Sequence, residues 1–152
     1  MSEYDVTVER TTETPTAVVK AVTTWQEFPT LWRTLLDDVW AFLDSKPGLR
    51  GHGHNVMLYR NLTDADVAVE VGVQVSEAFV AAGRVVPSTL PGGDSATTVH
   101  QRTPSEIGAA HSAIRAWCSA HRHEVTGVRW EIYGDPNPQT GHFDVAVYWQ
   151  LA

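Results

Sequence analysis

The sequence has little of what would tie it to several classes of protein. Its single cysteine, Cys118, cannot form a disulfide within the chain. The opening residues lack the basic and apolar segments of a secretion signal, and no apolar run approaches the ~20 residues that cross a bilayer. These absences predict a cytoplasmic protein with no membrane segment.

Positive charge is also scarce. Eleven lysines and arginines stand against 18 aspartates and glutamates, which gives a formal net charge of −7. Because affinity for nucleic acid comes largely from basic side chains that displace counterions, we expect no nucleic-acid partner. The charge favours positively charged partners instead.

Signatures of phosphate, metal and nucleophile chemistry are missing. The chain has no glycine-rich phosphate loop and no Gly-x-Ser-x-Gly elbow. The pairs His52/His54 and His121/His123 have neither the spacing of a His-Glu-x-x-His helix nor a cysteine pair nearby. We therefore expect no metal and no cofactor, and a structural role for Cys118.

What is present suits one globular domain that spans residues 1–152. The hydrophobic content of 43% and the charged content of 19% are typical of a chain with its own core. Six tryptophans are unusual, since Trp offers a large flat apolar face with a polar group and recurs where ligands are held.

The spacing of apolar residues predicts two strands, a helix and two strands, followed by the same order again. Steps of three and four residues mark amphipathic helices that begin at Phe28 and at 104–106, the second with the stripe 107, 110, 114, 117 and 118. The strands are expected at 4–10, 17–22, 55–60, 67–75, 84–90, 96–101, 127–133 and 143–151. This pattern predicts an α+β fold of two pseudo-symmetric β-β-α-β-β units, 4–76 and 83–151, whose antiparallel sheets form a central groove with two long helices outside.

Aligning the two halves suggests which positions correspond. Met57-Leu58-Tyr59 falls opposite Glu131-Ile132-Tyr133, at an offset of 131 − 57 = 74. Asp66-Val67-Ala68-Val69 falls opposite Asp144-Val145-Ala146-Val147, at an offset of 144 − 66 = 78, which pairs Glu70 with Tyr148.

Strand alternation then sorts these residues onto two faces. One face would be aliphatic and suited to packing a helix; it holds 67, 69, 71, 73, 145, 147 and 149. The other face would carry Glu70 and Tyr148, together with Met57, Tyr59, Glu131 and Tyr133 from the preceding strands. This second face either lines a groove shared by the halves or is solvated, as one face of an antiparallel sheet commonly is.

The run 128–135, Val-Arg-Trp-Glu-Ile-Tyr-Gly-Asp, places the Glu131 carboxylate within a β-like segment flanked by aromatic residues. Desolvating such a charge costs several kcal/mol unless something pairs with it. Glu131 therefore indicates either an exposed position or a site that awaits a cation.

A resemblance to a known family rests on the segments Asp66–Val75 and Leu90-Pro91-Gly92-Gly93, and above all on Trp130-Glu131-Ile132-Tyr133. From about Tyr4 to Leu151, the chain resembles the GyrI-like small-molecule-binding domains. That family includes the effector-binding parts of bacterial multidrug-responsive transcription activators. The resemblance implies two strand-helix-strand-strand units and a groove closed at its base by a glutamate, which maps to Glu131. Unlike in the regulators, the predicted strands begin at residue 4, so we expect no DNA-binding helix-turn-helix in this sequence. It also has Gln101-Arg102-Thr103-Pro104 where members often carry a His-x-Gly-Pro-like stretch.

Three functions follow from this resemblance. The leading hypothesis is a stand-alone binding protein that sequesters hydrophobic, often cationic, aromatic xenobiotics. The expected ligand-binding residues are Glu131, Tyr133, Tyr148, Met57, Tyr59, Glu70 and Trp25, the last freer than Phe28, Trp32 and Trp117, which suit helix core stripes. The alternative is a hydrolase that opens the cyclopropane ring of genotoxic alkaloids, with Glu131 as general base and Tyr133 or Tyr148 stabilising the oxyanion. The third is inhibition of DNA gyrase by masking a basic surface.

Overall fold

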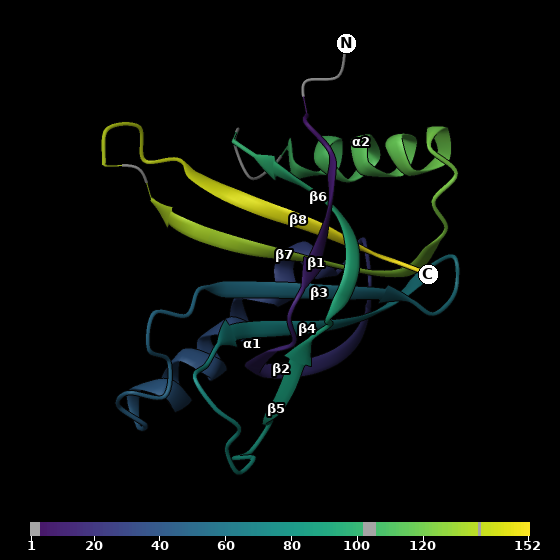
Figure 1. Ribbon diagram of the computed structural model, residues 1–152. Helices are drawn as coiled ribbons and strands as arrows, with labels where there is room; N and C mark the ends of the chain where they lie inside the picture. Colours follow the sequence, from purple (N-terminus) through teal and green to yellow (C-terminus); the bar gives the residue numbers. More distant parts are fainter. Residues whose placement is uncertain (1–3, 102–105, 137) are drawn as a thin grey trace.

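The computed structural model describes residues 4–101, 106–136 and 138–152 (Figure 1). Its elements match the predicted order closely. They are β1 (Thr7–Thr11), β2 (Thr14–Thr24), α1 (Phe28–Asp44), β3 (Asn55–Asn61), β4 (Asp66–Gln74), β5 (Val85–Leu90), β6 (Gly93–His100), α2 (Ile107–Ala120), β7 (Val125–Pro136) and β8 (Phe143–Leu151). The expected start of the second helix at 104 and 105 lies outside the described residues. Neither helix is long and apolar enough to cross a membrane, as far as the described residues show.

The eight strands form one antiparallel sheet in the order β1-β6-β8-β7-β3-β4-β2-β5. If β1, β2, β3 and β4 are exchanged with β5, β6, β7 and β8, the same strand order is obtained when the sheet is read from its other edge. The sheet therefore has a pseudo-twofold arrangement about the β3/β7 pair, which confirms the predicted α+β fold of two like units. Each unit also gives its first strand to the other, since β1 pairs with β6 and β5 pairs with β2.

The pseudo-twofold axis passes between Met57 and Glu131. These two residues lie directly opposite each other on β3 and β7, and they are also the residues that the predicted offset of 74 makes equivalent. Under the same offset Tyr59 corresponds to Tyr133. The middle of the sheet thus brings equivalent positions of the two halves side by side.

The predicted correspondence between β4 and β8 is wrong by two residues. Val71 lies beside Met57, and Val147 lies beside Glu131, so Val71 and Val147 are equivalent. Counting on from them, Tyr148 corresponds to Gly72 rather than to Glu70. The four-residue identity misled because a register shift between Tyr133 and Pro136 and a longer turn separate β7 from β8.

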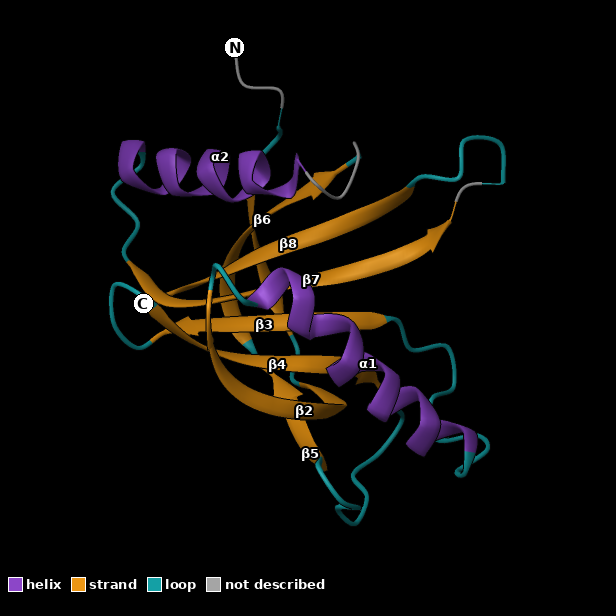
Figure 2. Cartoon of the chain, turned by 180° about the vertical axis from the view of Figure 1, so that it is seen from behind, coloured by secondary structure: helices purple, strands orange, loops and turns teal. Residues whose placement is uncertain are grey.

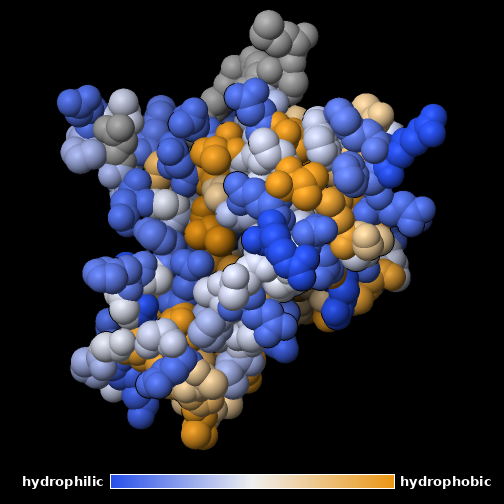
Figure 3. Space-filling model, in the orientation of Figure 1, coloured by the Kyte–Doolittle hydropathy of each residue, from blue (hydrophilic) through white to orange (hydrophobic). Residues whose placement is uncertain are grey.

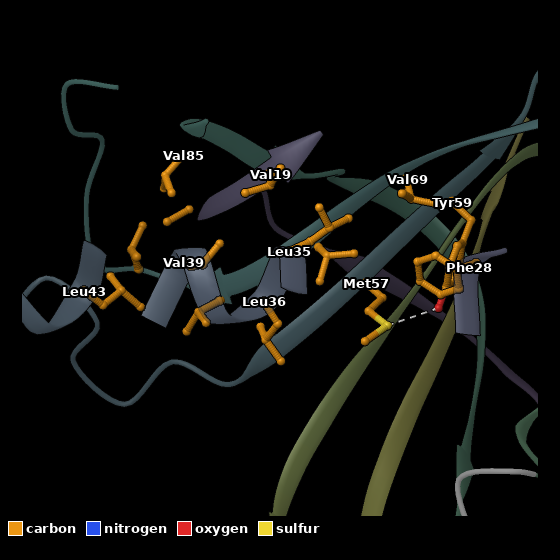
Figure 4. Packing of buried hydrophobic residues seen from close by; sticks show 14 of the residues in the cluster. Val19, Phe28, Leu35, Leu36, Val39, Leu43, Met57, Tyr59, Val69 and Val85 are labelled. Carbon is orange, nitrogen blue, oxygen red and sulfur yellow. Dashed lines mark hydrogen bonds between the residues drawn. The ribbon is translucent and has the colours of Figure 1, made fainter. Parts of the chain in front are cut away.

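Both helices pack on the same face of the sheet. On α1 the residues Leu35, Val39 and Leu43 recur at helical spacing and pack on the valines of β4 (Figure 4). On α2 the residues Ala110, Ile114 and Cys118 pack on β6 and β8. Seen from behind, α1 lies across β3 and β4 while α2 lies along the β6–β8 end (Figure 2). The two helices therefore cover the two ends of one sheet face.

The centre of the opposite face of the sheet is covered rather than solvated. Trp130 is 1% exposed there and packs with Val56, Leu58 and Leu90. β1 and β6 cross in front of this face (Figure 1). The surface seen from that side consists mostly of hydrophilic residues, with hydrophobic patches between them (Figure 3). The sheet thus curls over a second, smaller core.

The predicted division between the two faces needs correction. Residues directly opposite on neighbouring strands share a face, and Glu131 pairs with Met57 on one side and Val147 on the other. Glu131, Met57, Tyr59 and Tyr133 therefore lie on the helix-bearing face, together with the aliphatic residues of β4 and β8. The groove lies between the helices.

A glycine on β4 offers a test of this packing. A Cβ atom on Gly72 would collide with the Ala17 carbonyl group of β2, whereas a Cβ on Gly108 in α2 would meet nothing within 4 Å. We expect Gly72→Ala to lower the free energy of unfolding by about 1–3 kcal/mol, and Gly108→Ala to leave it unchanged or raise it by up to about 1 kcal/mol. Urea denaturation of both variants measures this, and equal effects would contradict the packing of β4 on β2.

Candidate functional site

A cavity of about 1150 Å³ opens between α1 and α2 above the centre of the sheet. Its floor consists of residues from β3, β7 and β8, and its walls come from the two helices. Aromatic side chains make up much of the lining: Trp25, Phe28, Trp32, Tyr59, Tyr133, Phe143 and Trp149. A volume of this size and character suits a drug-sized aromatic molecule.

Glu131 lies on the cavity floor and is 3% exposed. Its Oε1 accepts hydrogen bonds from the hydroxyl groups of Tyr59 at 2.7 Å and Tyr133 at 2.6 Å. Its Oε2 lies 2.6 Å from Nε2 of His111 on α2. The carboxylate is therefore buried rather than exposed, and it already has three hydrogen-bond partners.

A second hydrogen bond fixes the proton on His111. The indole nitrogen of Trp149 lies 2.9 Å from Nδ1 of His111. Because an indole N–H can only donate, Nδ1 must accept and the imidazole proton must be on Nε2, which donates to Glu131. All three groups bonded to Glu131 are thus neutral donors, and its negative charge is solvated by dipoles rather than paired with a cation.

The two tyrosines reflect the pseudo-symmetry of the fold. Tyr59 and Tyr133 occupy equivalent positions, and both hydroxyl groups contact Oε1 of Glu131 and the Met57 sulfur, at 3.4 Å and 3.7 Å for the sulfur. The centre breaks the symmetry, since one half supplies a thioether where the other supplies a carboxylate. Both halves therefore contribute a tyrosine at the same position, but only the second half contributes a charged residue, Glu131.

Burial and the nearby carboxylate change the acidity of both phenols. Burial raises the pKa of Tyr59 well above its usual value, and the negative charge of Glu131 raises it further. The pKa of Tyr133 is also raised, first by burial and then by Glu131. Both phenols therefore remain protonated donors to Glu131 throughout the physiological range.

Arg129 provides a positive charge on the same floor. It is 8% exposed, and its guanidinium carbon lies 5.2–5.8 Å from the ring centres of Trp25, Tyr59 and Trp149. Burial lowers its pKa, and Tyr59 and Glu131 partly oppose that shift. The cavity thus contains one buried charge of each sign.

The structure brings together five of the seven residues predicted to bind ligand. Glu131, Tyr133, Met57, Tyr59 and Trp25 all line the cavity. Trp25 is 44% exposed and stands at its edge, with its ring 5.2 Å from that of Tyr59.

Tyr148 and Glu70 do not line the cavity. Tyr148 lies directly opposite Trp130 on the other face of the sheet and stacks on its ring at 5.3 Å. Glu70 also lies on that face, where it accepts a hydrogen bond from Ser88. Both were placed in the groove because alternation was counted within each strand, without the register that relates one strand to the next.

Three residues that define the site were missed. His111 lies one helical turn after Ile107, so the stripe of the second helix could have placed it toward the sheet. Strand alternation predicted a helix-packing face for Trp149, and Arg129 was not among the predicted ligand-binding residues. Alternation from Glu131 would have put Arg129 on the floor, but its approach to aromatic rings of other elements required the fold.

No metal-binding group is evident in the described ranges, where no three His, Cys, Asp or Glu side chains converge. Cys118 is buried on the core side of α2, and burial raises the pKa of its thiol. A buried thiol with a raised pKa is a structural residue.

Comparison with known proteins identifies the family. The model of the GyrI-like small molecule binding domain matches residues 4–152. No protein of curated function matches the sequence itself.

Solved structures agree with the family match. The crystal structure of the EcmrR C-terminal domain is 14% identical with a TM-score of 0.78, covering 99% of this chain and 98% of that one. SAV2435 bound to tetraphenylphosphonium is 10% identical with a TM-score of 0.69, over 97% and 94% of the two chains. A hydrolase from Listeria innocua is 12% identical with a TM-score of 0.61, over 100% and 94%. At these identities the likeness establishes the fold.

The raised pKa values of the two phenols predict an alkaline loss of stability. An unfolded tyrosine ionises near pH 10.0, whereas folded Tyr59 and Tyr133 do not. Their contribution is therefore complete below about pH 10 and is lost as the pH rises toward the folded values, with a slope of up to about 1.4 kcal/mol per pH unit for each phenol. Urea denaturation between pH 8 and 11 should show a shallower alkaline decline for Tyr59→Phe/Tyr133→Phe than for wild type. Parallel declines would contradict buried, protonated phenols.

Proposed function

The chain belongs to the GyrI-like small-molecule-binding family, and on that premise we propose that its cavity binds and sequesters lipophilic cationic aromatic molecules in the cytoplasm. One observation carries this proposal. Glu131 is a buried carboxylate at the floor of an aromatic-lined cavity, and its three hydrogen-bond donors are all neutral.

Electrostatics supports a cationic guest. Neutral donors satisfy hydrogen bonds but leave the net charge of Glu131 in place, so the field of the carboxylate extends into the cavity. Because Glu131 is buried and little screened by solvent, a positive charge near the carboxylate is attracted more strongly than in bulk water. A delocalised cation gains most, because it loses little hydration on entry.

The shape and lining of the cavity support an aromatic guest. Trp25 and Phe28 lie on the α1 side, while Tyr133 and Phe143 lie toward β7 and β8. A flat cation over such a ring face gains about 0.5–2 kcal/mol from each contact. The structural relative SAV2435 was solved with tetraphenylphosphonium, a lipophilic cation with four aromatic rings.

Replacing one carboxylate tests the proposal. We expect Glu131→Gln to weaken binding of tetraphenylphosphonium by at least about tenfold, because it removes the charge while keeping the size of the side chain and one acceptor oxygen. Glu70→Gln is the matched control, since Glu70 lies on the other face of the sheet. Calorimetric titration and quenching of tryptophan fluorescence give the affinities.

A neutral probe separates charge from shape. Triphenylphosphine oxide is aromatic and uncharged, so its affinity should be nearly the same for wild type and Glu131→Gln. Equal affinity of both proteins for tetraphenylphosphonium would refute the role of Glu131.

Hydrolysis is a second candidate because one acceptor position of Glu131 remains. A carboxylate accepts about four hydrogen bonds, and Glu131 accepts three, which leaves one on Oε2 for a water molecule. Glu131 would take a proton from that water as its oxygen bonds to a ring carbon of a cyclopropane conjugated to a carbonyl group. The strained C–C bond then breaks, its electron pair moves to the carbonyl oxygen, and Tyr133 or Tyr59 turns its hydroxyl group from Glu131 to donate to that oxyanion. Tyr148 lies on the other face and is not available for this step.

Mass spectrometry tests the hydrolase hypothesis. Incubation with a cyclopropane-bearing alkaloid should yield the ring-opened product with one added water, and Glu131→Gln should lower the rate by at least about a hundredfold. A substrate that binds but is recovered unchanged would leave binding alone as the function.

A further inference from the structure

Among the residues that the structure describes, the buried cation Arg129 has no anionic partner. Two of its five N–H groups are used, by the Gly127 carbonyl oxygen and by Oδ1 of Asn61, both at 3.0 Å. Among the described residues, no carboxylate oxygen lies within 4.0 Å of its guanidinium nitrogens. At 8% exposure this is costly, since buried charges are normally paired.

A second guanidinium converges on the same place. Arg115 of α2 lies 5.9 Å from the ring of Trp149, and Arg129 lies 5.2 Å from that ring. The charge of Arg115 also lowers the pKa of Arg129. Arg115 and Arg129 both line the cavity and both lie near the Trp149 ring, so they form a local positive region beside the negative charge of Glu131.

The fold keeps the opposite charges of the floor apart. Arg129 and Glu131 are two residues apart on β7 and point to the same face of the sheet, so their Cα atoms are about 7 Å apart along the strand. The carboxylate oxygens of Glu131 are occupied by Tyr59, Tyr133 and His111, while the guanidinium lies over the ring of Tyr59. The tyrosine therefore stands where a direct ion pair between them would form.

We propose that the cavity selects aromatic zwitterions: molecules with a delocalised cation and, on the same framework, a carboxylate or similar anionic group. The cation lies beside Glu131, and the anionic group accepts hydrogen bonds from Arg129 and Arg115. This inference rests on the proposed binding function and narrows its ligand class. A purely cationic guest would leave the two guanidinium groups unpaired and would be repelled by them.

Two dyes that differ at one group test the inference. Rhodamine 110 carries a free carboxylate on a cationic xanthene, and rhodamine 123 is its methyl ester. We expect wild type to bind rhodamine 110 at least about tenfold more tightly, since hydrogen bonds between charged groups are about twice as strong as those between neutral groups. Fluorescence anisotropy measures both affinities at a fixed salt concentration.

Arginine variants locate the source of the preference. Arg129→Gln should reduce the ratio of the two affinities to near one, because it weakens binding of rhodamine 110 and removes the repulsion that opposes binding of rhodamine 123. Arg115→Gln should lower the ratio partially, and because Arg115 is exposed it serves if Arg129→Gln does not fold. Arg60→Gln is the matched control, because Arg60 lies on the other face of the sheet.

The outcomes distinguish this inference from the function on which it rests. If tetraphenylphosphonium binds in a Glu131-dependent way but wild type binds the ester as well as the acid, or binds neither dye, the zwitterion inference is overturned and the binding function stands. If tetraphenylphosphonium and both dyes all fail to bind, both proposals fall.

Discussion

The site depends on how the charge of Glu131 is kept inside the protein. A carboxylate that is 3% exposed would be strongly destabilising without partners, and the chain supplies three neutral ones. Each donor comes from a different element: Tyr59 from β3, Tyr133 from β7 and His111 from α2. The carboxylate thus ties the two halves of the sheet to the second helix, while its net charge remains available to the cavity.

The pseudo-twofold fold explains why the site lies where it does. Equivalent positions of two like halves meet only near the axis, and here that axis passes between Met57 and Glu131. Tyr59 and Tyr133 repeat around it, so one pair of hydroxyl groups converges on one carboxylate. Placing the helices on the same face and at opposite ends of the sheet leaves the centre open, and the cavity occupies that gap.

Local patterns were sufficient to predict the elements but not how the strands are related. The apolar spacing from Phe28 and the alternation around Glu131 each reflect contacts within one element, which sequence periodicity records directly. The assignment of Tyr148 and Glu70 to the groove failed because strand register is set by turns and bulges between elements. A shift of one residue in that register exchanges the two faces of a strand.

By itself, the sequence determined the α+β class, the order of the elements and the likeness of the halves, and it singled out Glu131 as a candidate site residue. Only the tertiary structure decided that Glu131 is buried on the helix-bearing face and that His111 donates to it. It also decided that Arg129 lies unpaired over aromatic rings drawn from other elements. The reason is that periodicity encodes which side of an element is apolar, whereas the partners of a buried charge come from distant segments that meet only when strand pairing brings them together.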